Sequence, residues 1–546
     1  MPMSRGVKTG IIGTVFAGML GVAGFGAYNI YTGLDSGGGG GGSSANEQSS
    51  PTNSAPPSGK DVTDIASDFL TAWSSGDITR AAQLTDSPRT STGALTAYKT
   101  QAHVTSVEFT PSPPTETAPT VVPFTVTAQV SYQGVAVPWS YRSSLAVVRG
   151  IAGKPVVQWK QSVLNPHLGD GDTLVTGQVP APDLEIVDRK GRVMDPADYP
   201  SLVRIIPDLR SRYADKVGGG TPGTETYVEK GDQSAPQTLN VLKKGKPARL
   251  ETTLDATIQK AAEKAVTGKD KSGVTAVDVN TGGILAVAYN PASGFDYALR
   301  DNAAPGSTFK IVTSAALLEH GMTPSSPAKC INGANINQGK PYKNDGNMNN
   351  PSANLKWDFA QSCNTGFILK ANTIGTSGLK NAAAQFGLTK EWNIGTPTQD
   401  PSVPGGSGDE FTSEMIGQGQ IQASPLIMAS VAATARTGDF HQPRIVAKSL
   451  IEGPIATAPG ISQQTSQYLR QMMRSAITSG TASGVMSGFG PDSGAKTGSA
   501  ETDTSAEPNG WFTAYDGSVA AAAVVHSGGH GNQSAGPIVA AVLRAS

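Results

Sequence analysis

The stretch Ala304–Lys310 constrains the fold and the chemistry of this chain more than any other part of its sequence. It reads Ala-Pro-Gly-Ser-Thr-Phe-Lys, and an apolar pattern at helical spacing follows it. The sequence therefore predicts that Ser307 lies in the first turn of a helix. Because residues three apart share one face of a helix, Ser307 and Lys310 are expected to lie side by side. A lysine in this position can accept the proton of the serine, which indicates an activated serine nucleophile.

The pattern Ser-x-x-Lys is common, so other motifs must support this interpretation. Ser307 stands at a predicted helix start and is followed by Ser-x-Asn at Ser362–Asn364 and by Lys-Thr-Gly at Lys496–Gly498. The three motifs therefore follow one another along the chain in the order serine helix, Ser-x-Asn and Lys-Thr-Gly. The last of them comes just before two predicted terminal strands. The other copies of the serine pattern in the chain are Ser326/Lys329, Ser377/Lys380 and Ser493/Lys496.

A second Ser-x-Asn, at Ser352 and Asn354, is a rival for the middle motif. It lies in a stretch rich in proline and asparagine, whereas Ser362 lies between two apolar stretches with helical spacing. We therefore favour Ser362 and Asn364.

Predicted strands stand at both ends of the region that holds these motifs. A hairpin at its start has a good turn at Asn280–Gly283, and a pair of strands ends the chain. Helical patterns fill the middle, so the sequence predicts a sheet with helices. The predicted elements are the helix Thr257–Val266 and the strands Gly273–Asp278, Gly283–Tyr289, Gly510–Tyr515 and Ser518–His526.

The three motifs in this order resemble those of the penicillin-binding proteins. The resemblance covers Arg249–Ser546, and the region before it is too short for a glycosyltransferase domain. The chain is therefore most similar to class B members, which are monofunctional D,D-transpeptidases. The resemblance implies a β-lactamase-like transpeptidase domain at 249–546, with an antiparallel sheet flanked by helices. Flanking residues that agree are Pro305-Gly306, Gly417-Gln418-Gly419 and Trp511-Phe512.

The resemblance also implies how the enzyme would cross-link peptidoglycan stem peptides. Ser307 would attack the carbonyl between two D-alanines and form an acyl-enzyme, with Lys310 as a base of lowered pKa. Ser362 would relay a proton to the leaving amine, and Asn364 would orient Lys310. β-Lactam antibiotics, which mimic the substrate, would acylate Ser307.

The last motif would bind the terminal carboxylate of the substrate. Lys496 would add positive potential, the hydroxyls of Thr497 and Ser499 would bind the carboxylate, and Gly498, between them, belongs to the same substrate-binding motif. The backbone N–H groups of Ser307 and Ser499 would form the oxyanion hole. The resemblance implies no cofactor and no metal.

The N-terminal part predicts a membrane anchor and a tether. Residues 10–31 hold no charged residue and are mostly apolar, a length that can span a bilayer. Basic residues precede them in the tail 1–9, so we expect a cytoplasmic N-terminus, one pass through the plasma membrane and an extracytoplasmic catalytic domain. A cleaved signal peptide is the alternative. Residues 32–60 hold six consecutive glycines and are predicted to be a flexible linker.

Residues 61–168 predict a small α+β domain, because helical patterns are followed by period-two segments. This region is similar to the NTF2-like domain of some class B members. Residues 169–248 are similar to the pedestal, or dimerisation, segment of these members. The similarity is carried by the stretch Asp183–Arg192. The predicted helices are Asp61–Ser75 and Ile78–Leu84, and the predicted strands are Val104–Phe109, Val121–Tyr132, Val135–Val148 and Val156–Val163.

Charge and cysteine content limit the partners and the redox chemistry. The net charge is −1, without a long basic run, so nothing favours nucleic acid. The expected partners are stem peptides, β-lactams and a membrane glycosyltransferase of wall synthesis. Cys330 and Cys363 can form a disulfide outside the cytoplasm, with two buried thiols as the alternative. Cys363 is expected to be structural rather than nucleophilic, and His526 and His530, at metal-pair spacing, lack further ligands.

Three alternatives share the motifs. A D,D-carboxypeptidase or endopeptidase would use the same site, and so would a β-lactam-binding sensor. A serine β-lactamase is a weaker alternative, because it needs a glutamate that activates a water molecule. The nearest glutamate after Asn364 is Glu391, which is predicted to lie on the surface.

Overall fold

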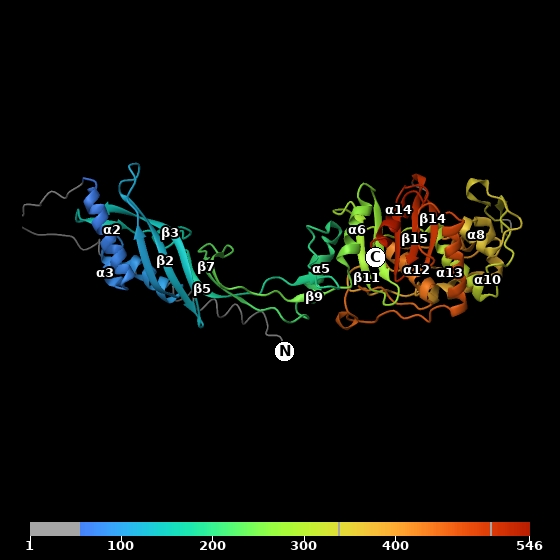
Figure 1. Cartoon of the computed structure of the whole chain (residues 1–546), viewed down its shortest axis with the longest axis horizontal. Helices are drawn as coiled ribbons and strands as arrows, with labels where there is room; N and C mark the ends of the chain where they lie inside the picture. The colour runs from blue at the N-terminus through green and yellow to red at the C-terminus, as the bar shows by residue number, and fades with distance from the viewer. Residues whose placement is uncertain (1–54, 337–338, 503–504) are drawn as a thin grey trace, which may run out of the picture. The chain divides into compact units, whose positions relative to one another are not determined.

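The computed structural model describes residues 55–336, 339–502 and 505–546 (Figure 1). The predicted tail 1–9, the predicted anchor 10–31 and most of the predicted linker 32–60 lie outside these residues. Among the described residues, no helix has the length and apolar character needed to cross a membrane. The chain divides into two compact units. Of the described residues, the first unit comprises those up to Leu95 together with Phe109–Thr125 and Arg142–Val163, and the second comprises the others.

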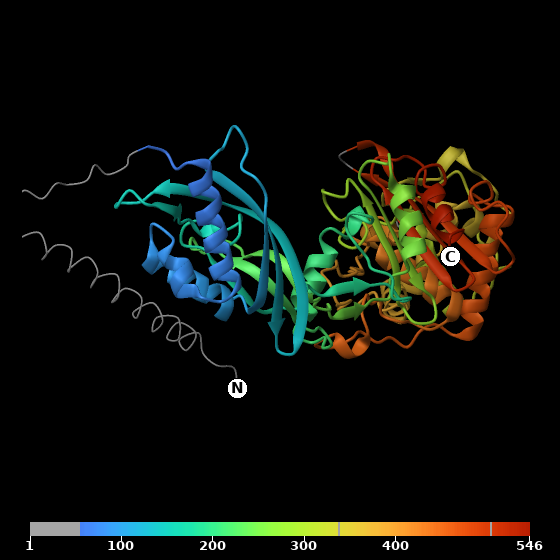
Figure 2. The same cartoon turned by 60° about the vertical axis from the view of Figure 1, so that its left-hand side comes forward.

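The region predicted as a small α+β domain contains three helices and a four-stranded sheet in the order β1-β2-β3-β4. Helix α2, blue in Figure 2, contacts β4 and buries Phe69 and Trp73. Ser58 and Asp61 cap its N-terminus reciprocally. The elements are α2 (Gly59–Ser74), α3 (Ile78–Gln83), α4 (Pro88–Thr100), β1 (Val104–Pro111), β2 (Val121–Tyr132), β3 (Val135–Arg149) and β4 (Pro155–Gln158).

Most of these predicted elements are confirmed, but the fourth strand is not as long as predicted. It ends at Gln158, because the N–H of Trp159 donates to the Asp86 carboxylate rather than continuing the strand ladder. Residues Gln161–Val163 then form a 3₁₀ turn instead of strand. Helix α4 was not predicted.

A connecting region with its own sheet follows, as its mixed pattern predicted. Three strands pair in the order β5-β7-β8, and β6 pairs in parallel with β9. The elements are β5 (Thr173–Val179), β6 (Glu185–Val187), α5 (Ile205–Tyr213), β7 (Gly223–Glu229), β8 (Gln237–Lys243) and β9 (Arg249–Glu251).

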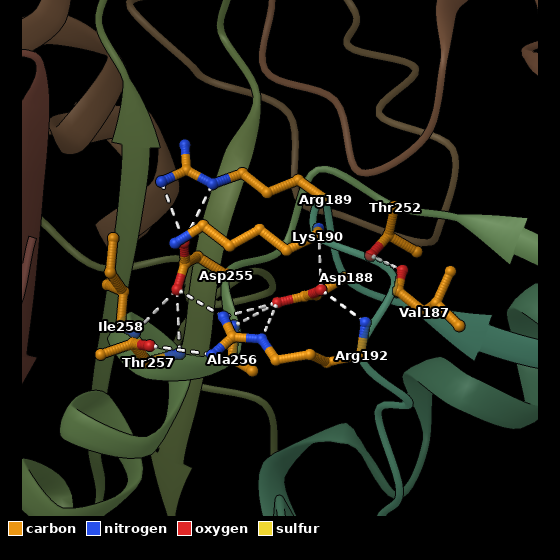
Figure 3. A network of polar contacts seen from close by, with 10 residues as sticks. All are labelled: Val187, Asp188, Arg189, Lys190, Arg192, Thr252, Asp255, Ala256, Thr257 and Ile258. Carbon is orange, nitrogen blue, oxygen red and sulfur yellow. Dashed lines mark hydrogen bonds and ion pairs between the residues drawn. The ribbon is translucent and has the colours of Figure 1, made fainter.

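Two buried aspartates join this region to helix α6, Ala256–Val266 (Figure 3). Asp255 caps the helix, accepting the N–H of Thr257, and Arg192 contacts the carboxylates of both Asp188 and Asp255. Burial raises the pKa of Asp255, but hydrogen bonds from Lys190 and the backbone outweigh it and hold that pKa below its ordinary value. The acids therefore stay charged and fix the strand-turn segment against helix α6.

The C-terminal region is built on a five-stranded sheet in the order β11-β10-β16-β15-β14, with each neighbouring pair antiparallel. All residues of β16 are buried, which requires cover on both faces. Helices α6 and α14 form one group against the sheet, and α7, α12 and α13 form another. The strands are β10 (Ser272–Asp278), β11 (Ile284–Asn290), β14 (Ser493–Thr502), β15 (Ser505–Asp516) and β16 (Val519–Val525).

This sheet confirms the predicted hairpin and the predicted terminal strand pair, with shifts of a residue or a few at the ends. The remaining elements lie between β11 and β14 or after β16. They are α7 (Lys310–Glu319), β12 (Gly333–Ala334), β13 (Tyr342–Lys343), α8 (Leu355–Gln361), α9 (Asn364–Ile368), α10 (Ala371–Gln385), α11 (Asp409–Glu414), α12 (Pro425–Thr437), α13 (Gln463–Thr478) and α14 (Ala535–Leu543).

Candidate active site

Ser307 lies in a 3₁₀ turn, Gly306–Phe309, that leads directly into α7. The sequence predicted that Ser307 lies in the first turn of an α-helix. The structure instead places it in the tighter 3₁₀ turn just before that helix. Gly306 has a φ of +53°, and its N–H donates to Gly417 O over 2.9 Å. A Cβ at Gly306 would come within 2.5 Å of Ser499 O, so the backbone there can approach β14 only as glycine. This packing sets Ser307 against the strand that carries the last motif.

Lys310 is the centre of the site. Its Nζ donates to Ser307 Oγ over 2.9 Å, to Ser362 O over 2.9 Å and to Asn364 Oδ1 over 2.8 Å. Its side chain is fully buried, whereas Ser307 is partly exposed. These contacts bring the first and the middle motifs together around one ammonium group.

Ser362 joins α8 to α9 in a left-handed conformation, with a φ of +63°. Its Oγ accepts a hydrogen bond from Lys496 Nζ over 2.8 Å, and Lys496 also donates to Thr497 O. The rival Asn354 instead caps α8, accepting the N–H of Trp357. The structure thus brings Ser362, rather than Ser352, to the other two motifs.

The two lysines lie in an environment that disfavours charge. Burial lowers the pKa of Lys310 to about 7, although the nearby Asp358 acts in the opposite direction. Burial and the charge of Lys310 lower the pKa of Lys496 well below its ordinary value. The resemblance implied a lowered pKa for Lys310, and burial of the side chain is its cause.

The last motif lies on β14, which is the edge strand of the sheet. Lys496 is fully buried, and Thr497 Oγ1 lies 2.6 Å from Thr481 Oγ1. A Cβ at Gly498 would come within 2.9 Å of Thr308 Cγ2, so the glycine lets the Ser307 turn pack on the strand. An edge strand leaves backbone groups open to pair with an extended peptide.

Comparison with known families now decides the class of this site. The family described as "penicillin binding protein transpeptidase domain" matches residues 272–544, half of the 546 residues. The chain belongs to the penicillin-binding protein transpeptidase family. The match begins at β10 and ends within one residue of the end of α14, so it spans the whole five-stranded sheet.

Named relatives are D,D-transpeptidases. Peptidoglycan D,D-transpeptidase PbpA of Mycobacterium tuberculosis is 28% identical over 358 residues, which cover 54% of this chain and 72% of the relative. PbpA of Mycolicibacterium smegmatis is 27% identical over 357 residues, which cover 54% of this chain and 70% of the relative. The ceftriaxone acyl-enzyme complex of penicillin-binding protein A from M. tuberculosis matches with a TM-score of 0.50 at 25% identity, covering 55% of this chain and 81% of that one.

A disulfide between Cys330 and Cys363 lies directly beside the middle motif of this family member. Both cysteines are buried, and Cys363 stands between Ser362 and Asn364 in the sequence. The bond fixes the short turn between α8 and α9 to the loop that holds Cys330. Cys363 is therefore held in a structural bond and is not a free thiol.

Sequence reasoning missed Asn344, which organises the loop around the middle motif. Its Oδ1 accepts the backbone N–H groups of Asn364 and Thr365, over 2.9 and 3.0 Å, and its Nδ2 donates to Ile331 O. No local pattern marks this residue, because its partners are distant in sequence.

Sequence reasoning also missed Asp358, a fully buried acid one helical turn before Ser362. Neither carboxylate oxygen has a hydrogen-bond partner among the described residues. A Cβ at Gly366 would overlap Asp358 Oδ2, so Gly366 leaves the space that the carboxyl occupies. Burial raises the pKa of Asp358 to about 8, against the influence of Lys310 and Lys370.

Proposed function

We propose that this chain is a peptidoglycan D,D-transpeptidase that acts through a Ser307 acyl-enzyme. The position of Lys310 carries the proposal: its Nζ contacts Ser307 Oγ at 2.9 Å in a buried environment that lowers its pKa to about 7. A base is most effective when its pKa lies near the working pH. The names of the relatives and the acyl-enzyme structure of the mycobacterial protein support the same reaction.

The first half-reaction moves the acyl group to Ser307. Uncharged Lys310 takes the hydroxyl proton of Ser307 while Oγ bonds to the carbonyl carbon of the penultimate D-alanine. The N–H groups of Ser307 and Ser499 stabilise the negative oxygen, an interaction whose loss costs about 3–4 kcal/mol per donor. The carbon–nitrogen bond then breaks, and the leaving amine receives the hydroxyl proton of Ser362. Lys496, which donates to Ser362 Oγ, supplies the replacement proton.

The second half-reaction reverses these proton movements. An amine from a neighbouring stem peptide attacks the acyl carbon and passes its proton through Ser362 to Lys496. Lys310 returns a proton to Ser307 Oγ as the ester bond breaks, which restores the starting state. Asn364 Oδ1 holds Lys310 in place throughout. A β-lactam enters the first half-reaction but leaves an acyl group that no amine removes.

Glu391 does not support the alternative that the chain is a serine β-lactamase. This glutamate is exposed on the surface between α10 and α11, whereas the water-activating glutamate of such an enzyme must face the acyl group. The carboxypeptidase and sensor alternatives differ from transpeptidation only in the acceptor of the acyl group and in its turnover. They are therefore outcomes of the experiment below.

We also propose a cellular setting for the enzyme from its sequence. The apolar run 10–31 supports a single-pass anchor in the plasma membrane, with the N-terminus in the cytoplasm and the catalytic domain outside. Three helices beside a four-stranded sheet support an NTF2-like domain at 61–168. The separate three-stranded sheet β5-β7-β8 supports the assignment of 169–248 as a pedestal segment. A monofunctional enzyme needs glycan strands to cross-link, which supports a membrane glycosyltransferase as its partner.

The test is a product analysis with purified protein and a stem pentapeptide, with and without an acceptor amine. The proposal predicts a cross-linked peptide and free D-alanine when the amine is present, and loss of both products in Ser307→Ala. Release of D-alanine by hydrolysis alone, unchanged by the amine, would indicate a carboxypeptidase. Acylation by penicillin without turnover of any peptide would indicate a sensor.

A further inference from the structure

Three segments that are distant in sequence meet beside Ser499. They are the turn after β13, strand β14 and the turn that precedes α14. His530 Nδ1 lies 3.5 Å from Ser499 Oγ and 3.5 Å from Asp345 Oδ2. The imidazole therefore stands between a hydroxyl of the last motif and a carboxylate from the loop next to the middle motif.

Asp345 is held in this place by its neighbour. Asn344 is buried, and its side chain donates to Ile331 O and Met348 O over 2.7 and 2.8 Å. It also accepts the N–H of Asn364. The backbone at Asp345 is thus tied to the Ser-x-Asn motif through the side chain of Asn344.

His530 is held from the other side. Its carbonyl accepts the N–H groups of Gln533 and Ser534 over 3.0 and 3.2 Å. A Cβ at Gly531 would overlap Gly498 O and Trp511 O, so the backbone next to His530 packs directly on β14 and β15. The backbone at His530 consequently keeps its place relative to Ser499 on β14.

The contact between the side chains of His530 and Asp345 is exposed to solvent and weak. The side chains of His530 and Asp345 are 53% and 76% exposed. A distance of 3.5 Å is longer than that of a strong charge-assisted hydrogen bond. Exposed ion pairs contribute little to stability, so an entering carboxylate can replace Asp345 at small cost.

We propose that His530 is a further substrate-binding residue, which contacts the terminal carboxylate of the substrate, and that the Asp345 carboxylate holds this position in the free enzyme. The inference rests on the proposed function, for which the resemblance to penicillin-binding proteins implies that the hydroxyls of Thr497 and Ser499 bind the substrate carboxylate. The N–H of a histidine is a hydrogen-bond donor that suits a carboxylate acceptor. In the free enzyme, the Asp345 carboxylate thus lies beside the site that binds the terminal carboxylate of the substrate.

The experiment measures acylation of the full chain by a fluorescent penicillin with a free carboxylate, resolved into a binding constant and a limiting rate. Asp345→Asn removes the competing charge and should raise the second-order rate constant about two- to fivefold, through tighter binding. His530→Gln should lower it about tenfold through weaker binding, with the limiting rate unchanged. The control is Asp64→Asn, which breaks an exposed ion pair with Lys60 on α2 and should change neither quantity.

A second pair of substrates separates a loss of carboxylate binding from a general loss of activity in the His530→Gln variant. His530→Gln should slow the reaction of a stem peptide that ends in D-alanine by raising KM, and should hardly affect the same peptide ending in D-alanine amide. An unchanged or slower reaction in Asp345→Asn, or a fall in the limiting rate alone in His530→Gln, would overturn the inference. Absence of any label on Ser307 in the unsubstituted protein would refute the proposed function instead. Matching thermal midpoints show that each variant is folded.

Discussion

The rate of acylation should rise with pH as the buried Lys310 loses its proton and becomes an active base. At a pKa of about 7, roughly half of the Lys310 side chains are uncharged at pH 7, whereas the ordinary value of 10.5 would leave about one in three thousand uncharged. The structure therefore gives the base a gain of about a thousandfold in its active form at neutral pH. Because Lys310 and Lys496 interact, the observed midpoint belongs to the pair.

The assay is stopped-flow acylation by a fluorescent penicillin between pH 5 and pH 10. We expect the second-order constant to increase about tenfold per unit below the midpoint, and to fall again at the pH where Lys496 loses the proton that it supplies through Ser362. Asp358 raises the pKa of Lys310 only through its charged form, which is the minor form below the carboxyl's own pKa of about 8, so Asp358→Asn should move this rise only slightly to lower pH. Asp296→Asn is the matched control, since Asp296 is also buried with a raised pKa and has no influence on Lys310. A midpoint near 10, or a clear shift of the midpoint in Asp296→Asn, would refute the reasoning.

Further predictions concern stability. The double variant Cys330→Ser/Cys363→Ser removes a bond between residues separated by 33 positions and should lower the free energy of unfolding by about 3–4 kcal/mol, measured by urea denaturation under oxidising conditions. The folded-state pKa of Asp358 is raised from 3.8 to about 8, so folding is favoured at low pH and loses stability as pH rises between these values. Asp358→Asn should therefore stabilise the protein more at pH 8 than at pH 5, and an equal effect at both would contradict this. Gly366→Ala should destabilise by about 1–3 kcal/mol, because its Cβ meets the Asp358 carboxyl, and adding Asp358→Ala should recover part of the loss.

The sequence predicted most elements that have a clear period and clear ends. The hairpin around Asn280–Gly283 and the strand pair near the C-terminus were found because apolar runs and turn residues mark them. Helix α4 was missed because Pro88–Thr100 is rich in threonine and serine and carries a weak apolar pattern. The strand beginning at Pro155 was predicted too long, since the contact of Trp159 with Asp86 comes from a distant residue.

The candidate site shows the same division. Ser307 and Lys310 share a turn, and their local motif predicts their contact. Ser362 and Lys496 could be named only through the order of the motifs, because 134 positions separate the residues of that hydrogen bond. Asn344 and Asp358 have no local signal at all: the first matters through backbone groups across a loop, and the second through its burial beside Gly366. Their importance follows from packing, which a single sequence does not display.

The most direct test of the account is to locate the penicillin adduct by peptide mass mapping of the labelled protein. We predict a single adduct on the peptide that carries Ser307, and no adduct in Ser307→Ala at the same penicillin concentration. An adduct on another serine of the unsubstituted protein, or undiminished labelling of Ser307→Ala, would contradict the central claim that Ser307 is the nucleophile.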